Sequence, residues 1–393
     1  MSAPEVFILA GEASGDTKGA GLVEAALRQA PGVRFWGVGG RRMRAAGVEI
    51  LFDSADLAVN GFVEAMAHAR RIWYIYRRLR AALAERRPAL AVLIDFPDFN
   101  LFFARRVNRL GIPLLWYVSP QVWAWRRYRV RKLGRRVTRM MVVFPFEAPL
   151  YADQGVAVDF VGHPLVDIAR PRLPRDETMR KLDLDPARPL IGLLPGSRRS
   201  ELSRIYPLLL HAAELMAAQR PDLQFATPVA ATLGMETLAD HVKAANVRVA
   251  LAEDLTYEIM AAADAAAVAA GTATLECALQ DTPHVMVYRL SPVTYLLKPI
   301  VNLAHYCLVN VVAKRRVVPE LIQRDCTPEA VAARTLALLG PEGEAQRRGL
   351  ADVRARLGGG GANARAAQVL LGMLGPAGGR VLPGEKAGGE ATA

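Results

Sequence analysis

The feature that most constrains the fold is a repeated order of segments: a short apolar run, a glycine-rich or polar loop, and an amphipathic stretch. In the first part of the chain, the apolar runs cover residues 6–10, 34–38, 91–94, 113–118, 140–144 and 156–161. Helix-like stretches lie between them, notably at 17–29, 63–86 and 102–110. Apolar runs that do not alternate with polar residues are typical of parallel strands covered by helices on both faces. The order therefore predicts an α/β fold with a doubly wound parallel sheet.

The same order starts again after a break rich in proline. Pro164, Pro171 and Pro174 interrupt a polar stretch, which we interpret as a domain linker. The second series has strand-like runs at 189–194, 223–228, 247–251, 265–269 and 284–288, and helix-like stretches at 201–218, 256–262 and 274–279. With 393 residues, the chain is also too long for one ordinary core.

We therefore expect two Rossmann-like domains in tandem. The first would cover residues 1–165 and the second residues 166–345, followed by closing helices at 346–375 and a disordered tail at 376–393. In doubly wound sheets, ligands bind beyond the carboxyl ends of the strands. Two such domains are expected to face each other across a cleft.

Charge and cysteine content narrow the class of protein. The formal net charge of +12 indicates an anionic partner such as nucleic acid, a phosphorylated ligand or an acidic membrane surface. The three cysteines include no CxxC pair, so neither a disulfide framework nor a zinc site is predicted, and a reducing cytosol fits. The N-terminus is predicted to be a first strand rather than a signal peptide. Lys298 and Pro299 interrupt the apolar stretch 295–313, so it is not predicted to span a membrane.

The first glycine-rich loop, GEASGDTKGAG at residues 11–21, follows the first predicted strand. Its spacing matches neither the dinucleotide fingerprint nor the P-loop. Two interpretations stay open. It is either an ordinary turn in which Asp16 caps a helix, or a loop in which Glu12 and Asp16 bind sugar hydroxyls.

Two loops of the second series have the composition of an anion site. LLPGSRRSE at 193–201 places Gly196 and Ser197 at a helix start beside Arg198, which suits a diphosphate. AAGTATLECAL at 269–279 places Thr272 one helical turn before Glu276, which suits a phosphate and a ribose diol. The alternatives are a solvated basic turn in the first loop, and a helix cap with an exposed glutamate in the second.

Two carboxylates follow a buried strand in VLIDFPDFN, residues 92–100. One of them can act as a general base for a hydroxyl nucleophile. The alternative is that both accept hydrogen bonds from the next helix. We favour a structural role for Asp95 and a chemical role for Asp98.

Two stretches combine aromatic and basic residues. Residues 119–139 include Trp123 and Trp125, and residues 63–87 include the aromatic cluster 72–76. Such composition fits stacking on RNA, contact with an anionic membrane interface, or basic helices whose aromatic residues lie in the core. An RNA-binding module is disfavoured because it would leave most of the chain without a role.

No metal site is predicted. Asp183 and Asp185 form an Asp-x-Asp pattern, but they lie in a turn before a strand, and the six histidines show no metal-binding spacing. His163, in the string GHPL, is expected to be a hydrogen-bonded hinge residue rather than a base.

Eight strings together resemble one family, the lipid-A-disaccharide synthases, which have the GT-B glycosyltransferase fold. They are AGEASGD (10–16), DFPDFN (95–100), SPQVWAW (119–125), FPFE (144–147), GHPL (162–165), LLPGSR (193–198), GTATLE (271–276) and PEL-x-Q (319–323). Their order along the chain is that of the family. The resemblance implies an inverting transfer from UDP-2,3-diacylglucosamine to the 6-hydroxyl of 2,3-diacylglucosamine 1-phosphate (lipid X). The products would be a β-1,6 disaccharide phosphate and UDP, and neither a metal nor another cofactor is implied.

The resemblance also assigns roles to residues on the acceptor side. Asp98 of DFPDFN would be the base that takes the proton of the acceptor hydroxyl. Glu12, Ser14 and Asp16 of AGEASGD would line the acceptor site.

Other matching residues would bind the donor. Ser197 and Arg198 would hold the diphosphate of UDP, Thr272 would contact phosphate and Glu276 would contact ribose. Asn310 would help to hold the nucleotide sugar.

The chain departs from the family pattern at two positions. Ala270 stands where the family usually has serine, and Val309 stands where it tends to have proline, so the nucleotide contacts near them are less defined. The acylated, anionic substrates imply a cytoplasmic enzyme bound peripherally to the inner membrane through an anionic lipid surface, with no nucleic-acid partner. The rival of the same fold is a UDP-sugar 2-epimerase.

Overall fold

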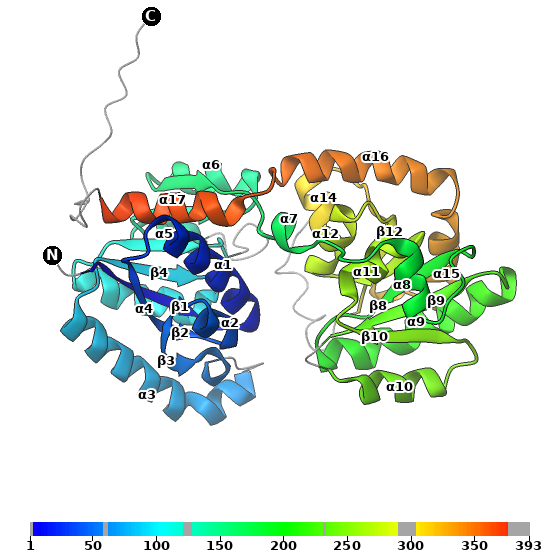
Figure 1. Ribbon diagram of the computed structural model, residues 1–393, viewed down its shortest axis with the longest axis horizontal. Coiled ribbons are helices and arrows are strands. Elements are labelled where there is room, and N and C mark those ends of the chain that lie inside the picture. The colour runs from blue at the N-terminus through cyan, green and yellow to red at the C-terminus, as the bar shows by residue number, and fades with distance from the viewer. Residues whose placement is uncertain (1–2, 58–61, 121–127, 231–232, 290–303, 376–393) are drawn as a thin grey trace, which may run out of the picture. The chain divides into compact units, whose positions relative to one another are not determined.

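The computed structural model describes residues 3–57, 62–120, 128–230, 233–289 and 304–375. The chain divides into two compact units (Figure 1). Unit 1 contains Met1–Pro164 together with Gly359–Ala393, and unit 2 contains Leu165–Gly358. The expected tail at 376–393 lies outside the described residues.

Unit 1 is built on a sheet of seven parallel strands in the order β3-β2-β1-β4-β5-β6-β7. The strands are β1 (Glu5–Ala10), β2 (Arg34–Gly39), β3 (Glu49–Asp53), β4 (Leu90–Ile94), β5 (Leu114–Tyr117), β6 (Arg139–Val142) and β7 (Ala157–Phe160). In the centre, Ile8 of β1 lies opposite Gly37 of β2 and Val92 of β4. Since β4 is buried along its whole length, its apolar sequence is explained by helices on both faces.

Helices cover both faces of this sheet. The helices of unit 1 are α1 (Ala13–Gln29), α2 (Arg41–Ala45), α3 (Phe62–Arg86), α4 (Pro97–Arg109), α5 (Tyr128–Gly134), α6 (Ala148–Ala152) and α17 (Ala362–Leu374). On one face, Leu79 of α3 and Phe103 of α4 join Phe7 of β1 in one core cluster. α17 runs beside α1 (Figure 1), where the side chain of Gln29 donates a hydrogen bond to the carbonyl of Ala364.

Unit 2 repeats the design with six parallel strands in the order β10-β9-β8-β11-β12-β13. They are β8 (Leu190–Leu194), β9 (Gln224–Val229), β10 (Val249–Glu253), β11 (Ala265–Ala269), β12 (His284–Tyr288) and β13 (Glu320–Ile322). The described helices are α7 (Leu165–Ile168), α8 (Arg175–Lys181), α9 (Arg199–Gln219), α10 (Met235–Lys243), α11 (Thr256–Ala262), α12 (Thr272–Leu279), α14 (Leu308–Ala313), α15 (Pro328–Ala337) and α16 (Pro341–Arg356).

The α/β class and the parallel sheets predicted from the apolar runs are confirmed, with some local differences. Strands β3 and β13 were not predicted, since β3 is a partly exposed edge strand and β13 has only three residues. α4 begins at Pro97 rather than near residue 102. Proline at the first helical position is favourable because its fixed φ suits the helix and its missing N–H is not needed there.

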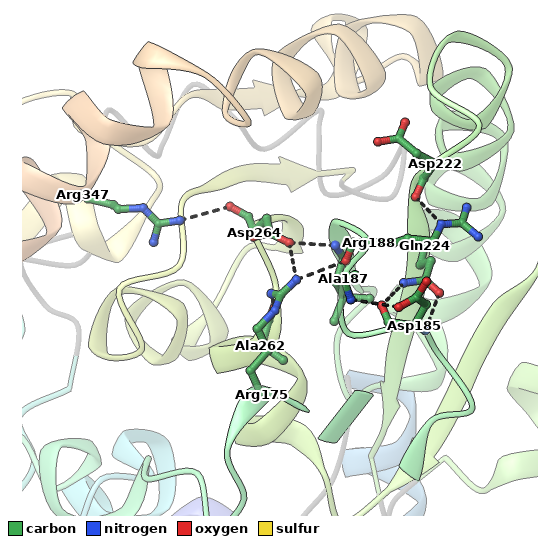
Figure 2. Close-up of polar contacts among 10 residues, drawn as sticks. Arg175, Asp185, Ala187, Arg188, Asp222, Gln224, Ala262, Asp264 and Arg347 are labelled. Atoms are coloured by element: carbon green, nitrogen blue, oxygen red, sulfur yellow. Dashed lines mark hydrogen bonds and ion pairs between the residues drawn. The ribbon is translucent and has the colours of Figure 1, made fainter. Parts of the chain in front are cut away.

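The amino ends of the central strands of unit 2 are held by polar contacts (Figure 2). The carboxylate of Asp264, which directly precedes β11, accepts hydrogen bonds from Leu190 N at 2.8 Å and from Arg175 Nη2 at 2.9 Å. Arg347 reaches the backbone carbonyl of Asp264 from α16 at 3.4 Å. These contacts fix β8 against β11 at the edge opposite to the glycine-rich loops.

Both sheets reverse their strand order at one point. The reversal lies between β1 and β4 in unit 1, and between β8 and β11 in unit 2. In open α/β sheets the ligand site forms at this switch point, beyond the carboxyl ends of the two strands. A ligand site is therefore expected at the loops that follow these four strands.

Candidate functional site

The loops after β1 and β4 are in close contact at the switch point of unit 1. A Cβ atom placed on Gly11 would lie only 2.2 Å from Cδ1 of Phe96. Glycine at this position lets the Phe96 ring lie directly on the backbone of the first loop. The first loop thus supports the loop that carries the two candidate carboxylates.

The loop after β4 has an unusual backbone. Asp95 and Phe96 both have positive φ angles, of 44° and 45°. Non-glycine residues adopt this region at a cost of order 1–3 kcal/mol each, and they cluster at functional sites. The buried side chain of Asn100 holds the conformation, because its amide donates to the carbonyls of Ile94 at 3.2 Å and Asp95 at 2.9 Å.

The carboxylates of Asp95 and Asp98 have different environments. Asp95 lies 3.9 Å from the ammonium of Lys18. Desolvation raises the pKa of Asp95 above its ordinary value, and the Lys18 charge opposes that rise. Asp98 is in the first turn of α4, its side chain is 77% exposed, and it forms an ion pair with Arg129. The Asp98 side chain is therefore the more accessible of the two, since the Asp95 side chain is 36% exposed.

The residues of the first loop divide into two groups. Glu12 and Ser14 are exposed at the start of α1. Asp16 is buried, and its carboxylate accepts hydrogen bonds from the backbone N–H groups of Gly40 at 2.6 Å and of Arg42 and Met43 at 3.1 Å. Asp16 therefore caps α2, the helix after β2, and we leave it out of the proposed substrate contacts.

His163 lies at the end of unit 1 and is 4% exposed. Its ring packs 5.1 Å from the ring of Phe144. Desolvation, with a smaller contribution from the Lys18 charge, lowers the pKa of His163 to about 3. The imidazole is therefore neutral at neutral pH.

The loop after β8 exposes the residues predicted to hold a diphosphate. Gly196 has φ = 100°, and a Cβ atom there would lie 2.5 Å from Oε2 of Glu201. Ser197 and Arg198 are exposed directly before α9. The Nη1 atom of Arg198 lies 3.6 Å from Oε1 of Glu201. Desolvation raises the pKa of the Glu201 carboxyl group above its ordinary value. The N-terminus of a long helix, with an arginine beside it, is a favourable place for phosphate groups.

The loop after β11 places Thr272 and Glu276 on one helix. Gly271 has φ = 151° and ψ = −160°, a region that is essentially restricted to glycine. Thr272 is exposed as the first residue of α12. Desolvation raises the pKa of Glu276 to about 7, although a side-chain hydrogen bond with Thr272 opposes the rise. Glu276 is thus a partly covered carboxyl group that titrates near neutral pH.

Asn310 is fully buried and all its polar atoms contact the chain itself. Its amide donates to Val318 O and Glu320 Oε1, both at 2.8 Å, and its carbonyl accepts from Val317 N at 2.7 Å and Val318 N at 2.8 Å. Glu320 also accepts from the backbone of Cys307 at 3.0 Å, next to the start of α14. These contacts give Asn310 a structural role, and we leave it out of the proposed nucleotide contacts.

The Asp-x-Asp pattern has partners within the chain. Asp183 forms an ion pair with Arg248. The side chain of Asp185 accepts a hydrogen bond from Ala187 N at 2.9 Å in its own turn (Figure 2). Among the residues that the structure describes, no group of three or more histidine, cysteine or acidic side chains is placed to hold a metal ion.

The basic-aromatic stretch on α3 exposes Trp73 and Tyr74, at 54% and 57% of their surfaces. Arg70, Arg77 and Arg78 line a cavity of about 380 Å³ with them. Trp123 and Trp125, from the second stretch, lie outside the described residues. In the described part of the chain, no helix has the length and apolar character needed to cross a membrane.

The two sheets define the class of protein. The solved structure of UDP-GlcNAc 2-epimerase from Neisseria meningitidis bound to UDP-GlcNAc aligns with 94% of this chain and 98% of its own, with a TM-score of 0.61 at 10% identity. The calicheamicin glycosyltransferase CalG4 aligns over 95% of this chain and 99% of its own, with a TM-score of 0.62 at 17% identity. The fold is that of the GT-B glycosyltransferases.

Sequence similarity identifies the family within that class. The model of the lipid-A-disaccharide synthetase family matches residues 6–367. The lipid-A-disaccharide synthase of Geobacter metallireducens is 46% identical over 373 residues, which are 94% of this chain and 97% of that protein. The same enzyme of Myxococcus xanthus is 42% identical over 95% of this chain and 98% of that protein. The chain belongs to the lipid-A-disaccharide synthase family.

Proposed function

We propose that this protein transfers the diacylglucosaminyl group of UDP-2,3-diacylglucosamine to the 6-hydroxyl of 2,3-diacylglucosamine 1-phosphate. The observation that carries the proposal is the family match over residues 6–367. The matched strings DFPDFN and GTATLE follow strands β4 and β11, and LLPGSR begins in the last two residues of β8. These three strands border the two switch points. Ligand sites of doubly wound sheets form at such points.

In the proposed reaction, Asp98 is the general base. Its exposed carboxylate takes the proton of the acceptor 6-hydroxyl while that oxygen forms a bond to the anomeric carbon of the donor. The bond from the anomeric carbon to the diphosphate oxygen breaks, so the configuration inverts and UDP leaves with the electron pair. Arg129, the ion-pair partner of Asp98, holds the carboxylate in place.

Unit 2 binds the donor in this proposal. The N–H groups at the start of α9, with Ser197 and Arg198, receive the diphosphate and stabilise the negative charge that develops on it. Thr272 contacts a phosphate oxygen, and Glu276 accepts hydrogen bonds from the ribose hydroxyls. Since the Glu276 carboxyl titrates at about 7, donor binding favours its ionised form.

The direct test is to incubate the purified protein with both substrates and to detect the disaccharide phosphate and UDP by mass spectrometry. Failure to form either product would reject the proposal. The rival activity, epimerisation of a UDP-sugar, is favoured only by the shared fold with the Neisseria meningitidis enzyme at 10% identity. Conversion of unacylated UDP-N-acetylglucosamine to its 2-epimer would support that rival.

The diphosphate role has its own test. Arg198 is exposed and carries the only side-chain charge in the LLPGSR string, so Arg198→Ala is expected to weaken inhibition by UDP without affecting folding. Unchanged inhibition would reject the contact.

We also propose that the protein works at the cytoplasmic face of the inner membrane. The exposed Trp73 and Tyr74, bordered by arginines of α3, suit the interface of an anionic bilayer. Flotation with anionic vesicles should show binding at low salt that weakens at high salt. Absence of binding at both salt concentrations would reject this location.

A further inference from the structure

A cationic groove lies beside Asp98 in unit 1. It encloses about 190 Å³ between two helices. From α4 it is lined by Asp98, Leu101, Phe102 and Arg105. These residues recur at the three- and four-residue spacing that places side chains on one helix face. The groove therefore extends along α4 from the candidate base.

The opposite wall comes from α5 and the turn that follows it. Arg129 and Lys132 are three residues apart, and Arg136 follows one turn later. Arg136 is fixed across the groove, because its Nη1 donates to the carbonyl of Leu101 at 2.8 Å. Together with Arg105, these residues give the groove four cationic side chains and one carboxylate.

The side chains that line this groove carry more positive than negative charge. Arg129 is paired with Asp98, but no ion pair within the described ranges joins Arg105 or Arg136 to a carboxylate. Desolvation lowers the pKa of Arg136 from its ordinary value, and the charge of Arg105 lowers it further. Two like charges held together at a partly desolvated site favour the entry of an anion between them.

We propose that this groove is the subsite that binds the phosphate of the acceptor sugar. Guanidinium groups match the geometry of phosphate oxygens, and Lys132 adds a further charge. Seven residues separate Asp98 from Arg105, which is about 10 Å along the helix axis. That spacing leaves room for one sugar ring between a base at the 6-hydroxyl and a guanidinium at the 1-phosphate.

The inference rests on the proposed function and extends it to substrate selection. Donor and acceptor carry the same diacylated glucosamine and differ in the group at carbon 1. A subsite that binds a phosphomonoester at carbon 1 distinguishes the acceptor from a sugar that lacks the phosphate. Arg105 is then a specificity residue on the same helix face as the base.

The test compares two acceptors and two variants in detergent micelles. The acceptors are 2,3-diacylglucosamine 1-phosphate and its counterpart with a free 1-hydroxyl. For Arg105→Gln, kcat/KM with the phosphorylated acceptor is expected to fall about 10- to 100-fold, mainly through KM, as when a charge-assisted hydrogen bond is removed. The value with the 1-hydroxyl acceptor should stay unchanged. Arg109→Gln, an exposed arginine one turn further along α4 and outside the groove, is the matched control.

The outcomes separate the subsite from the function on which it rests. If the unchanged protein forms no disaccharide, the proposed function fails and the subsite fails with it. If the protein is active but Arg105→Gln loses the same factor with both acceptors, or loses nothing, the subsite alone is rejected. A lipid headgroup is the other source of a phosphomonoester. If Arg105→Gln loses binding to phosphatidic acid vesicles but keeps the acceptor preference, the groove is a headgroup site and the inference is wrong.

Discussion

The loop after β4 in unit 1 and the loop after β11 in unit 2 both connect a buried strand to a helix, but they use different residues for the turn. In each, a buried parallel strand ends, the backbone turns through a region of positive φ, and a helix with a carboxylate begins. Unit 2 uses Gly271 for the turn, whereas unit 1 uses Asp95 and Phe96, which adopt positive φ at a cost. Asp98 is exposed and ion-paired, whereas Glu276 is covered and titrates at about 7.

The difference indicates what each carboxylate can do. An exposed carboxylate held by an arginine is available to take a proton from an incoming hydroxyl. A covered carboxyl that titrates near neutral pH is better suited to accept hydrogen bonds from a ligand that completes its burial. Four substitutions test this contrast.

The largest effect is expected for Asp98→Asn. Loss of a general base should lower turnover about 10²- to 10⁴-fold, while the fold and UDP binding are retained. Steady-state rates and UDP titration by calorimetry measure the two properties. Turnover near that of the unchanged protein would move the base to another acid, of which exposed Glu12 is the first candidate.

The next effect is expected for Glu276→Gln. In the unchanged protein Glu276 is neutral below its pKa of about 7, so UDP affinity should rise as pH increases through 7. The variant should bind UDP about tenfold more weakly above pH 8, as when a hydrogen bond to a charged group is weakened, and should lack that rise. Titration of UDP itself affects both proteins equally, so the comparison isolates Glu276. An identical pH dependence in the two proteins would reject the ribose role.

Gly271→Ala tests the turn of unit 2 alone. The new Cβ would meet no atom within 4 Å, so the whole effect should come from the backbone conformation. We expect the free energy of unfolding to fall by about 1–3 kcal/mol, as measured by urea denaturation. Gly372→Ala is the matched control, since Gly372 lies within α17 with open space around it. This substitution should raise the free energy of unfolding by about 0.5–1 kcal/mol. Equal effects of the two substitutions would show that the Gly271 conformation carries no special cost.

The smallest effect is expected for Asp95→Asn. Asparagine tolerates positive φ, and the ion pair that Asp95 forms among the described residues is a long contact of 3.9 Å with Lys18. The free energy of unfolding should therefore change by less than about 1 kcal/mol. The pKa of Asp95 in the folded protein is raised above its ordinary value of 3.8. Ionisation of Asp95 therefore lowers the free energy of unfolding as pH rises above 3.8. The variant should therefore gain stability relative to the unchanged protein as pH increases from 4 to 7. A loss of turnover as large as that of Asp98→Asn would make Asp95 part of the chemistry.

The strands around the candidate site could be predicted because their cause is local. β4 and β11 are continuous apolar runs, and β11 has the bounds expected from the sequence. The backbone of the loop after β4 could not be predicted, since Phe96 is of a residue type that rarely adopts positive φ. Nothing in the spacing of DFPDFN indicates that Asn100 turns back to hold this loop.

The roles of Asp16 and Asn310 depend on hydrogen-bond partners that the spacing of residues in the sequence does not reveal. Asp16 meets the backbone of Gly40, 24 residues further along the chain, because β1 and β2 lie side by side. Asn310 is surrounded by residues 317–320, which follow a turn without a clear motif. A residue type can suggest a ligand, but only the fold shows that a neighbouring backbone already occupies its hydrogen bonds.

The position of α17 has a consequence for the order in which the chain becomes complete during synthesis. Unit 2 is continuous from Leu165 to Gly358, whereas unit 1 needs both Met1–Pro164 and the segment after Gly358. The buried face of α17 includes Ala366, Ala367 and Leu370, and it packs along α1. Unit 2 is thus an insertion whose residues are all synthesised before α17. Unit 1 is begun first but is completed only after unit 2.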